Sequence, residues 1–140
     1  MAYCSQDDLL KMIPLEELAE ITSESGGTPD AAVVAEAIAK ADSEIDAYCG
    51  VQYLVPFDPV PDRVKSLSVD IALYHLYSRR SVAPVVRRQK YEDALVQLKA
   101  IAQGTAVVSV SGSTATSTGR EVTEMTSEAR VFSRTYLGRW

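Results

Sequence analysis

The 140-residue sequence contains few of the residues on which catalytic and metal sites depend. It has two cysteines, Cys4 and Cys49, and one histidine, His75. Two cysteines this far apart form neither a zinc ribbon nor a small disulfide scaffold, so we expect a reducing compartment. Gly-rich phosphate-binding motifs of the P-loop or dinucleotide type are missing as well. The sequence therefore predicts no catalytic residue, no metal ligand and no cofactor, and the protein is not expected to be an enzyme.

Long apolar runs are also missing. No stretch approaches the roughly 20 apolar residues that cross a bilayer. Polar and acidic residues interrupt positions 1–21, where a signal peptide has a continuous apolar run. We therefore expect a protein that is not exported and has no membrane contact.

The net charge of −5 conceals a strong division of charge along the chain. Residues 1–58 hold 12 acidic side chains and 2 lysines, which gives −10, whereas residues 59–140 hold 7 acidic and 12 basic side chains, which gives +5. Such polarity favours self-association, or docking on a charged partner, through complementary fields.

Helix signals fill the first hundred residues. Ser5 with Asp8 three positions later predicts a helix start, and a short helix over 15–21 follows Pro14. After a Gly-Gly loop, Thr28 as N-cap and Pro29 as first residue predict a long helix that ends before Gly50.

Two more long helices follow a proline-rich crossover. The first, over 62–80, is apolar on most sides and is expected to be central. The second, over 85–103, is expected to turn four residues inward: Tyr91, Leu95, Leu98 and Ala102. The predicted fold is all-α, a compact bundle of three long helices plus short N-terminal helices, over residues 1–104.

The C-terminal quarter changes character. Residues 105–127 are rich in Ser and Thr and are predicted to be a flexible tether. Residues 128–140 combine basic and aromatic side chains of the kinds that dominate binding hot spots. One interpretation is an extended or partly β docking arm that reaches a neighbour through Arg130, Phe132, Arg134, Tyr136 and Trp140. The other is an edge strand that folds back on its own helices.

Three polar groupings are candidates for function. His75 lies in an apolar helix, where a structural role is favoured over a catalytic one. Glu16, Glu17 and Glu20 form an EExxE pattern that resembles helical metal-dependent nucleotide pyrophosphatases, but no downstream ExxD follows, so a solvated helix face is favoured.

The third grouping is the densest basic cluster, and it comprises Arg79, Arg80, Arg87, Arg88 and Lys90. Contact with protein is favoured over contact with nucleic acid, because the acidic half of the chain would repel a duplex and no helix-turn-helix motif is present. Asp46 and Asp70 are expected to be buried partners of such arginines.

The order of these features resembles the small virion proteins encoded in the head genes of Mu-like phages and prophages. The resemblance rests on AxAxxEIDAY followed by CGVQY, LVPFDPVPDRVK, LSVDIALYHLYSRR, VxxRxKYEDALVQLKAIAQG and a terminal RVFSR before Leu137-Gly138. It implies an all-helical fold similar to head-tail connector (adaptor) proteins, which are structural. It also implies ring-forming self-assembly, the portal protein and a tail-side neck protein as partners, and a place in the virion neck after assembly in the bacterial host cytoplasm.

Overall fold

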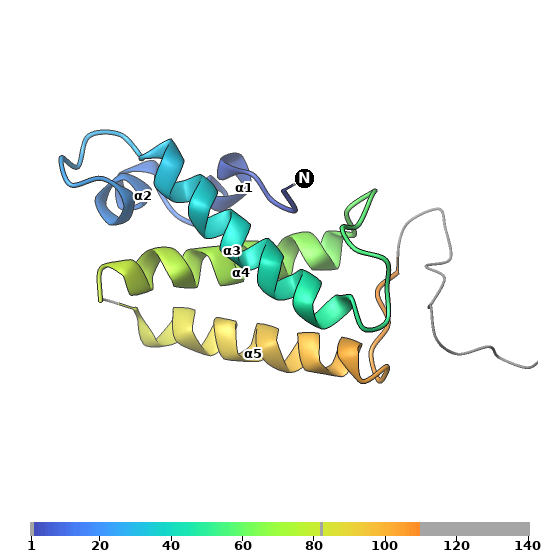
Figure 1. Cartoon of the computed structure of the whole chain (residues 1–140). Helices are drawn as coiled ribbons and strands as arrows, with labels where there is room; N and C mark the ends of the chain where they lie inside the picture. Colours follow the sequence, from blue (N-terminus) through green and yellow to red (C-terminus); the bar gives the residue numbers. More distant parts are fainter. Residues whose placement is uncertain (1, 82, 110–140) are drawn as a thin grey trace, which may run out of the picture.

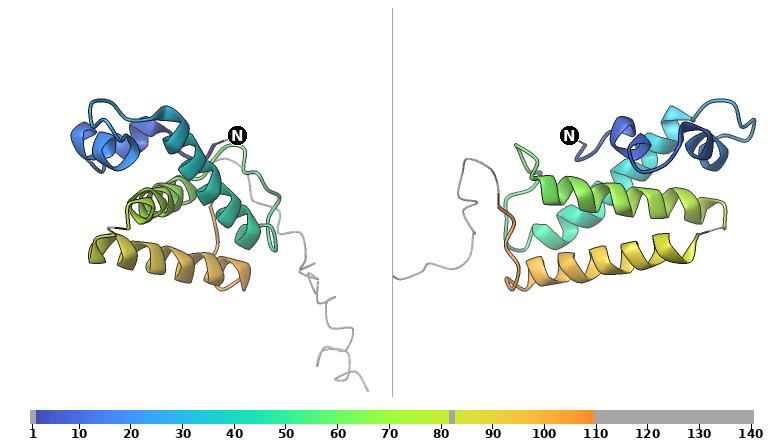
Figure 2. Two further views of the ribbon diagram at one scale, coloured as in Figure 1. Left: turned by 60° about the vertical axis from the view of Figure 1, so that its left-hand side comes forward. Right: turned by 180° about the vertical axis from the view of Figure 1, so that it is seen from behind.

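The computed structural model describes residues 2–81 and 83–109, and this part of the chain contains five helices and no strand. The helices are α1 (Gln6–Leu10), α2 (Leu15–Thr22), α3 (Ala31–Cys49), α4 (Asp62–Arg79) and α5 (Val85–Ala102). The three long helices pack together, and the short α1 and α2 lie on the opposite side of α4 from α5 (Figures 1 and 2). The expected all-α bundle is confirmed for these residues, whereas the predicted docking arm, 128–140, lies outside them.

The helix starts follow local capping chemistry. Ser5 and Asp8 form the predicted reciprocal capping box at the start of α1. At α3, however, the predicted cap is wrong. Asp30, not Thr28, is the N-cap, and its carboxylate accepts hydrogen bonds from the amides of Ala32 (2.9 Å) and Val33 (3.4 Å). The positive end of the helix dipole also stabilises the negative charge of the Asp30 carboxylate, whereas the neutral hydroxyl of Thr28 gains no such stabilisation.

Helix α4 is the centre of the core, as its apolar circumference predicts. It packs against α1, α2, α3 and α5. Its buried residues occupy more than one stripe and include Val64, Leu67, Ile71, Leu73 and Leu76. A helix surrounded on most sides must be apolar on most sides, which explains its weak amphipathicity.

The inward face of α5 differs from the prediction. Its buried residues are Ala94, Leu98 and Ile101, whereas Tyr91 and Leu95 are only half-buried. Helix α5 packs against both α3 and α4, and Ala94 is buried there together with Leu98 and Ile101. The larger Tyr91 lies at the edge, where its ring stacks on that of Tyr74 with centroids 4.1 Å apart.

The chain after α5 returns to the core. The backbone amide of Val108 donates to the hydroxyl of Tyr53 (3.0 Å), and Val108 is 1% exposed. The Gln52 side chain donates to the carbonyl of Ala102 (3.2 Å). The packed domain therefore extends beyond residue 104 to at least Val108. The rest of the predicted tether, from 110 to 127, lies outside the described residues.

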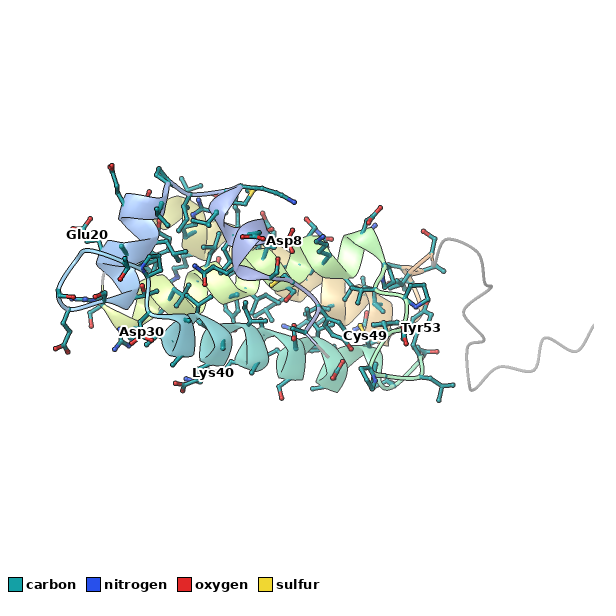
Figure 3. All side chains as sticks on the ribbon, turned by 90° about the horizontal axis from the view of Figure 1, so that it is seen from above. Asp8, Glu20, Asp30, Lys40, Cys49 and Tyr53 are labelled. Carbon is teal, nitrogen blue, oxygen red and sulfur yellow. The ribbon has the colours of Figure 1, made fainter. Side chains whose placement is uncertain are left out.

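The two ends of the bundle carry different features. Figure 3 places Glu20 and Asp30 toward one end of the molecule and Cys49 and Tyr53 toward the other. The α4–α5 turn lies at the first end and the α3–α4 loop at the second (Figure 1). The basic cluster and the last described residues after α5 are therefore at opposite ends (Figure 1).

Candidate interaction surfaces

Two arginines of the predicted basic cluster are used within the fold. Arg79 Nη1 donates to the carbonyl of Thr22 (3.3 Å), and Arg80 Nη2 donates to the carbonyl of Ser23 (2.7 Å). These carbonyls lie at the C-terminal end of α2, where helix carbonyls lack partners and the helix dipole favours a cation. Both arginines therefore hold α2 to the end of α4, and their predicted contact with a partner stays a prediction.

Of the remaining members of the cluster, Arg88 is exposed, Arg87 lies against Tyr77, and Lys90 is half-buried, where its charge lowers the pKa of Asp70. Arg88 forms an exposed ion pair with Glu92 on the next turn (3.2 Å). The Arg87 guanidinium lies 5.9 Å from the Tyr77 ring centroid, within cation–π range, and its Nη1 is buried with no hydrogen-bond partner among the described residues.

Exposed apolar residues lie at the start of the same helix. Val85 and Val86 are 82% and 63% exposed at the N-terminus of α5, between the arginines of α4 and those of α5. Two exposed valines next to cationic side chains form an amphipathic tip. We call this surface, residues 79–81 and 83–88, the basic tip.

The predicted arginine partners of the two helix aspartates are not found. Asp46 accepts its hydrogen bond from the hydroxyl of Tyr3. Asp70 has no ion pair within 4.0 Å among the described residues. Burial raises its pKa, and the charges of Lys90 and Arg87 only partly offset that effect. The expectation fails for Asp46 because its partner lies 43 positions away in the N-terminal segment, where helix periodicity gives no signal.

Tyr3 and Asp42 complete this polar network. The hydroxyl of Tyr3 also accepts the amide of Phe57 (3.2 Å), and its backbone amide donates to Asp42 (3.1 Å). Ser68 Oγ donates to the other oxygen of Asp42 (2.9 Å). Burial is the largest cause that raises the pKa of Asp42, even though both hydrogen bonds favour its charged form. A half-buried acidic site on α3 is thus present that sequence analysis missed.

His75 lies beside a second polar network, but the predicted bond to a neighbour is not formed through Nε2. This atom is buried 3.5 Å from Glu44 Oε1 and has no hydrogen-bond partner among the described residues, and the His75 ring meets Tyr91 edge-on at 5.9 Å. The Tyr91 hydroxyl donates to the same carboxylate (3.3 Å). Burial, followed by the charge of Glu44, raises the pKa of Tyr91 to about 12. The arrangement joins α3, α4 and α5 through one shared carboxylate.

The EExxE carboxylates do not converge on a common point. Glu17 accepts a hydrogen bond from the hydroxyl of Tyr77, while Glu16 and Glu20 are exposed. Across residues 2–81 and 83–109, no group of three or more His, Cys, Asp or Glu side chains is arranged to hold a metal ion. The two thiols, Cys4 and Cys49, are free and buried.

The C-terminal contacts predicted from sequence lie outside the described residues. These are Arg130, Phe132, Arg134, Tyr136 and Trp140, and their role stays a prediction. Within the described part of the chain, no helix is long and apolar enough to cross a membrane.

Taken together, residues 2–81 and 83–109 form a helical bundle in which polar clusters hold the helices together and charged and apolar side chains are exposed. Comparison with known proteins then identifies its family. The profile of the family described as "Bacteriophage Mu, Gp36" matches residues 3–126. A relative, the Mu-like prophage FluMu protein gp36 of Haemophilus influenzae, is 32% identical over 103 residues, which cover 73% of this chain and 72% of the relative.

The chain belongs to the Bacteriophage Mu Gp36 family. The resemblance to proteins of Mu-like phages and prophages is therefore confirmed.

Proposed function

We propose that this Mu-like phage protein is a structural head-tail connector that self-assembles and docks to the portal protein and to a tail-side neck protein. It would be made in the bacterial host cytoplasm and end in the virion neck. The proposal assigns it no catalytic step and no cofactor.

The observation that carries the proposal is the polarity of the protomer. Residues 1–58 carry −10 and residues 59–140 carry +5. In the fold, the basic tip lies at one end of the bundle (Figure 1), and the half-buried carboxylates Asp42 and Asp46 lie on α3. Contacts between unlike faces generate rings when the rotation closes, and complementary charge favours this arrangement over contacts between like faces.

A genetic experiment tests the connector role directly. A Mu-like prophage that carries this gene is induced with the gene intact and with it deleted, and the lysates are examined by electron microscopy. We expect the deletion to yield DNA-filled heads and separate tails that do not join. Complete virions would contradict the proposal, and so would a lysate without filled heads, because a connector acts after packaging.

Charge reversal tests the basic tip in the same assay. Arg88→Glu places a negative charge at the tip, whereas Lys99→Glu makes the same charge change at an exposed position near the other end of α5. Complementation by Arg88→Glu is expected to fall at least roughly tenfold, because one reversed charge in a complementary interface costs over a kilocalorie per mole. Lys99→Glu should complement normally. Equal complementation by both variants would remove the tip from the interface.

Deletion of residues 129–140 tests the predicted arm. We expect the shortened protein to keep the helical circular dichroism spectrum of the full chain while losing the ability to join heads to tails. Loss of the helical fold would show instead that the terminus belongs to the core.

A further inference from the structure

One exposed face of α3 contains a groove of about 440 Å³. Its lining includes Ala35, Ala39, Ser43, Asp42 and Asp46, together with Pro56 from the α3–α4 loop. The small side chains form a mainly apolar floor, and the carboxylates of Asp42 and Asp46 lie along it. We call this feature the α3 groove.

The charged side chains that line the α3 groove are acidic, although the charge of the N-terminal amino group also favours ionised Asp42. Asp42 and Asp46 are the charged residues of its lining. Two other cavities are mixed: one is lined by Glu36 with Lys40 and Arg79, and the other by Glu17 and Glu20 with Arg80. Among the described lysines and arginines, none forms an ion pair within 4.0 Å of Asp42 or Asp46; both carboxylates are bonded by neutral donors alone. The groove is therefore suited to a ligand that brings positive charge and an apolar group together.

We propose that in the free protein the α3 groove binds residues 128–140 of the same chain. An arginine of that segment would lie between Asp42 and Asp46, and an adjacent aromatic ring would lie on the alanine floor. This inference concerns the free chain, so its failure would leave the connector proposal untouched.

The composition of the segment matches the groove. Residues 128–140 contain three arginines against one glutamate, together with Phe132, Tyr136 and Trp140. A guanidinium next to two carboxylates forms charge-assisted hydrogen bonds, which are roughly twice as strong as neutral ones. Aromatic rings on a floor of small residues bury large apolar areas.

The position of the chain exit favours the same chain over a second copy. The backbone amide of Val108 donates to the hydroxyl of Tyr53. Tyr53 lies in the α3–α4 loop three positions before Pro56, which lines the groove, and Leu54 of the same loop is exposed. Taken as the flexible linker predicted by its sequence, residues 110–127 span about 21–25 Å on average. The groove reaches back along α3 from Asp46 to Ala35, which lies roughly 21 Å from the helix end at Cys49. A linker matched to the distance gives an effective concentration in the millimolar range, well above the micromolar concentration of other copies in a dilute sample.

Limited trypsin digestion of the full-length protein tests the proposal. Arg130 and Arg134 lie inside the segment, whereas Arg120 lies in the linker and serves as an internal control. Mass spectrometry measures the initial rate of cleavage at each site from the amount of product whose C-terminal residue is Arg120, Arg130 or Arg134. Docking should slow cleavage after Arg130 and Arg134 at least roughly tenfold relative to Arg120, because cleavage then requires release from the groove.

Two matched variants connect the protection to the groove. Ala39→Arg fills the floor and adds a repelling charge, whereas Ala47→Arg makes the same change at an exposed α3 residue outside the lining. Ala39→Arg should bring cleavage after Arg130 and Arg134 up to the Arg120 rate, and Ala47→Arg should behave as the wild type. Both replace an exposed helical alanine by another good helix former, and circular dichroism verifies that the fold is kept.

Three results would overturn the inference. Equal cleavage at all three sites in the wild type would show that the segment is free. Protection that survives Ala39→Arg would place it elsewhere. Protection that increases with protein concentration would show that the occupant comes from a second copy.

Discussion

The Asp8 carboxylate allows a quantitative test of how the N-terminal segment is held. It is buried and accepts hydrogen bonds from the amide and the hydroxyl of Ser5, both at 2.9 Å. It also pairs with Lys11 (3.1 Å) on the same segment and with Lys65 (3.2 Å) of α4. The Asp8 side chain thus connects the capping of α1 to the central helix.

Asp8→Asn keeps the shape of the side chain and removes its charge. The two lysines are 72% and 45% exposed, so each pair is worth at most about 1 kcal/mol. A carboxylate in the first turn of a helix adds about 0.3–1 kcal/mol. We expect the free energy of unfolding, measured by urea denaturation, to fall by about 2 kcal/mol. Asp7→Asn removes the same charge from an exposed position of α1 and should cost less than about 0.5 kcal/mol.

The pH dependence provides an independent test of the same reasoning. The Ser5 backbone amide, followed by the Ser5 hydroxyl and the two lysines, holds the pKa of Asp8 well below its usual range despite burial. The folded state therefore releases the Asp8 proton more readily than the unfolded state, and stability from Asp8 is present above about pH 4 and lost as the pH falls further. The difference between wild type and Asp8→Asn should shrink accordingly. A difference that stays constant down to about pH 3, or an equal effect of Asp7→Asn, would refute the assignment.

Three further predictions concern the core. Leu98→Ala should lower the free energy of unfolding by about 3 kcal/mol, because Leu98 is 0% exposed. Val96 on the same helix is 64% exposed, so Val96→Ala should change the free energy of unfolding little; equal urea midpoints for the two variants would contradict the observed buried face of α5. Burial and the charge of Glu44 raise the pKa of Tyr91 to about 12, so the stabilisation from Tyr91 is complete below about pH 10 and is lost as the pH rises through the pKa of the folded state. In an absorbance titration, the tyrosinate signal of Tyr91 should appear well above pH 10, as should those of Tyr3 and Tyr77, whose pKa values burial also raises; titration of Tyr91 near pH 10 would refute its burial. Burial raises the pKa of the Cys4 thiol, and burial raises the pKa of the Cys49 thiol to about 11. Both thiols should therefore resist a thiol reagent in native buffer and react after unfolding; rapid native labelling would contradict the packing.

Much of the fold was predictable because it depends on local and periodic signals. The Ser5–Asp8 pair marks a helix start within four residues, and the stripe of Val34, Ile38 and Ile45 marks the buried face of α3. These signals depend on neighbours in sequence, which the pattern contains in full. The error at the α3 start arose because the Thr28–Pro29 pair is typical of an N-cap and a first helical residue, whereas Asp30 is the residue whose carboxylate accepts the helix amides.

The surfaces were less predictable because they depend on contacts between distant residues. Tyr3 and Asp46 are 43 positions apart, and Tyr77 and Glu17 are 60 apart. Periodicity identified each helix but not which tyrosine meets which carboxylate. Likewise, the arginine cluster was visible as a run of charge, yet the carbonyls that Arg79 and Arg80 contact at the end of α2 carry no sequence signature at all.

The bonds of the N-terminal segment also set an order on folding during synthesis. Cys4 Sγ lies 3.2 Å from Ser68 Oγ, 64 positions later in the chain. At roughly 5–20 residues per second, the ribosome needs about 3–13 s to make the chain between them. For that interval the residues around Cys4 are without their partners, and α3 has no α4 to cover its apolar stripe. The segment that precedes α3 is therefore made before α4 and packs only after α4 has been synthesised.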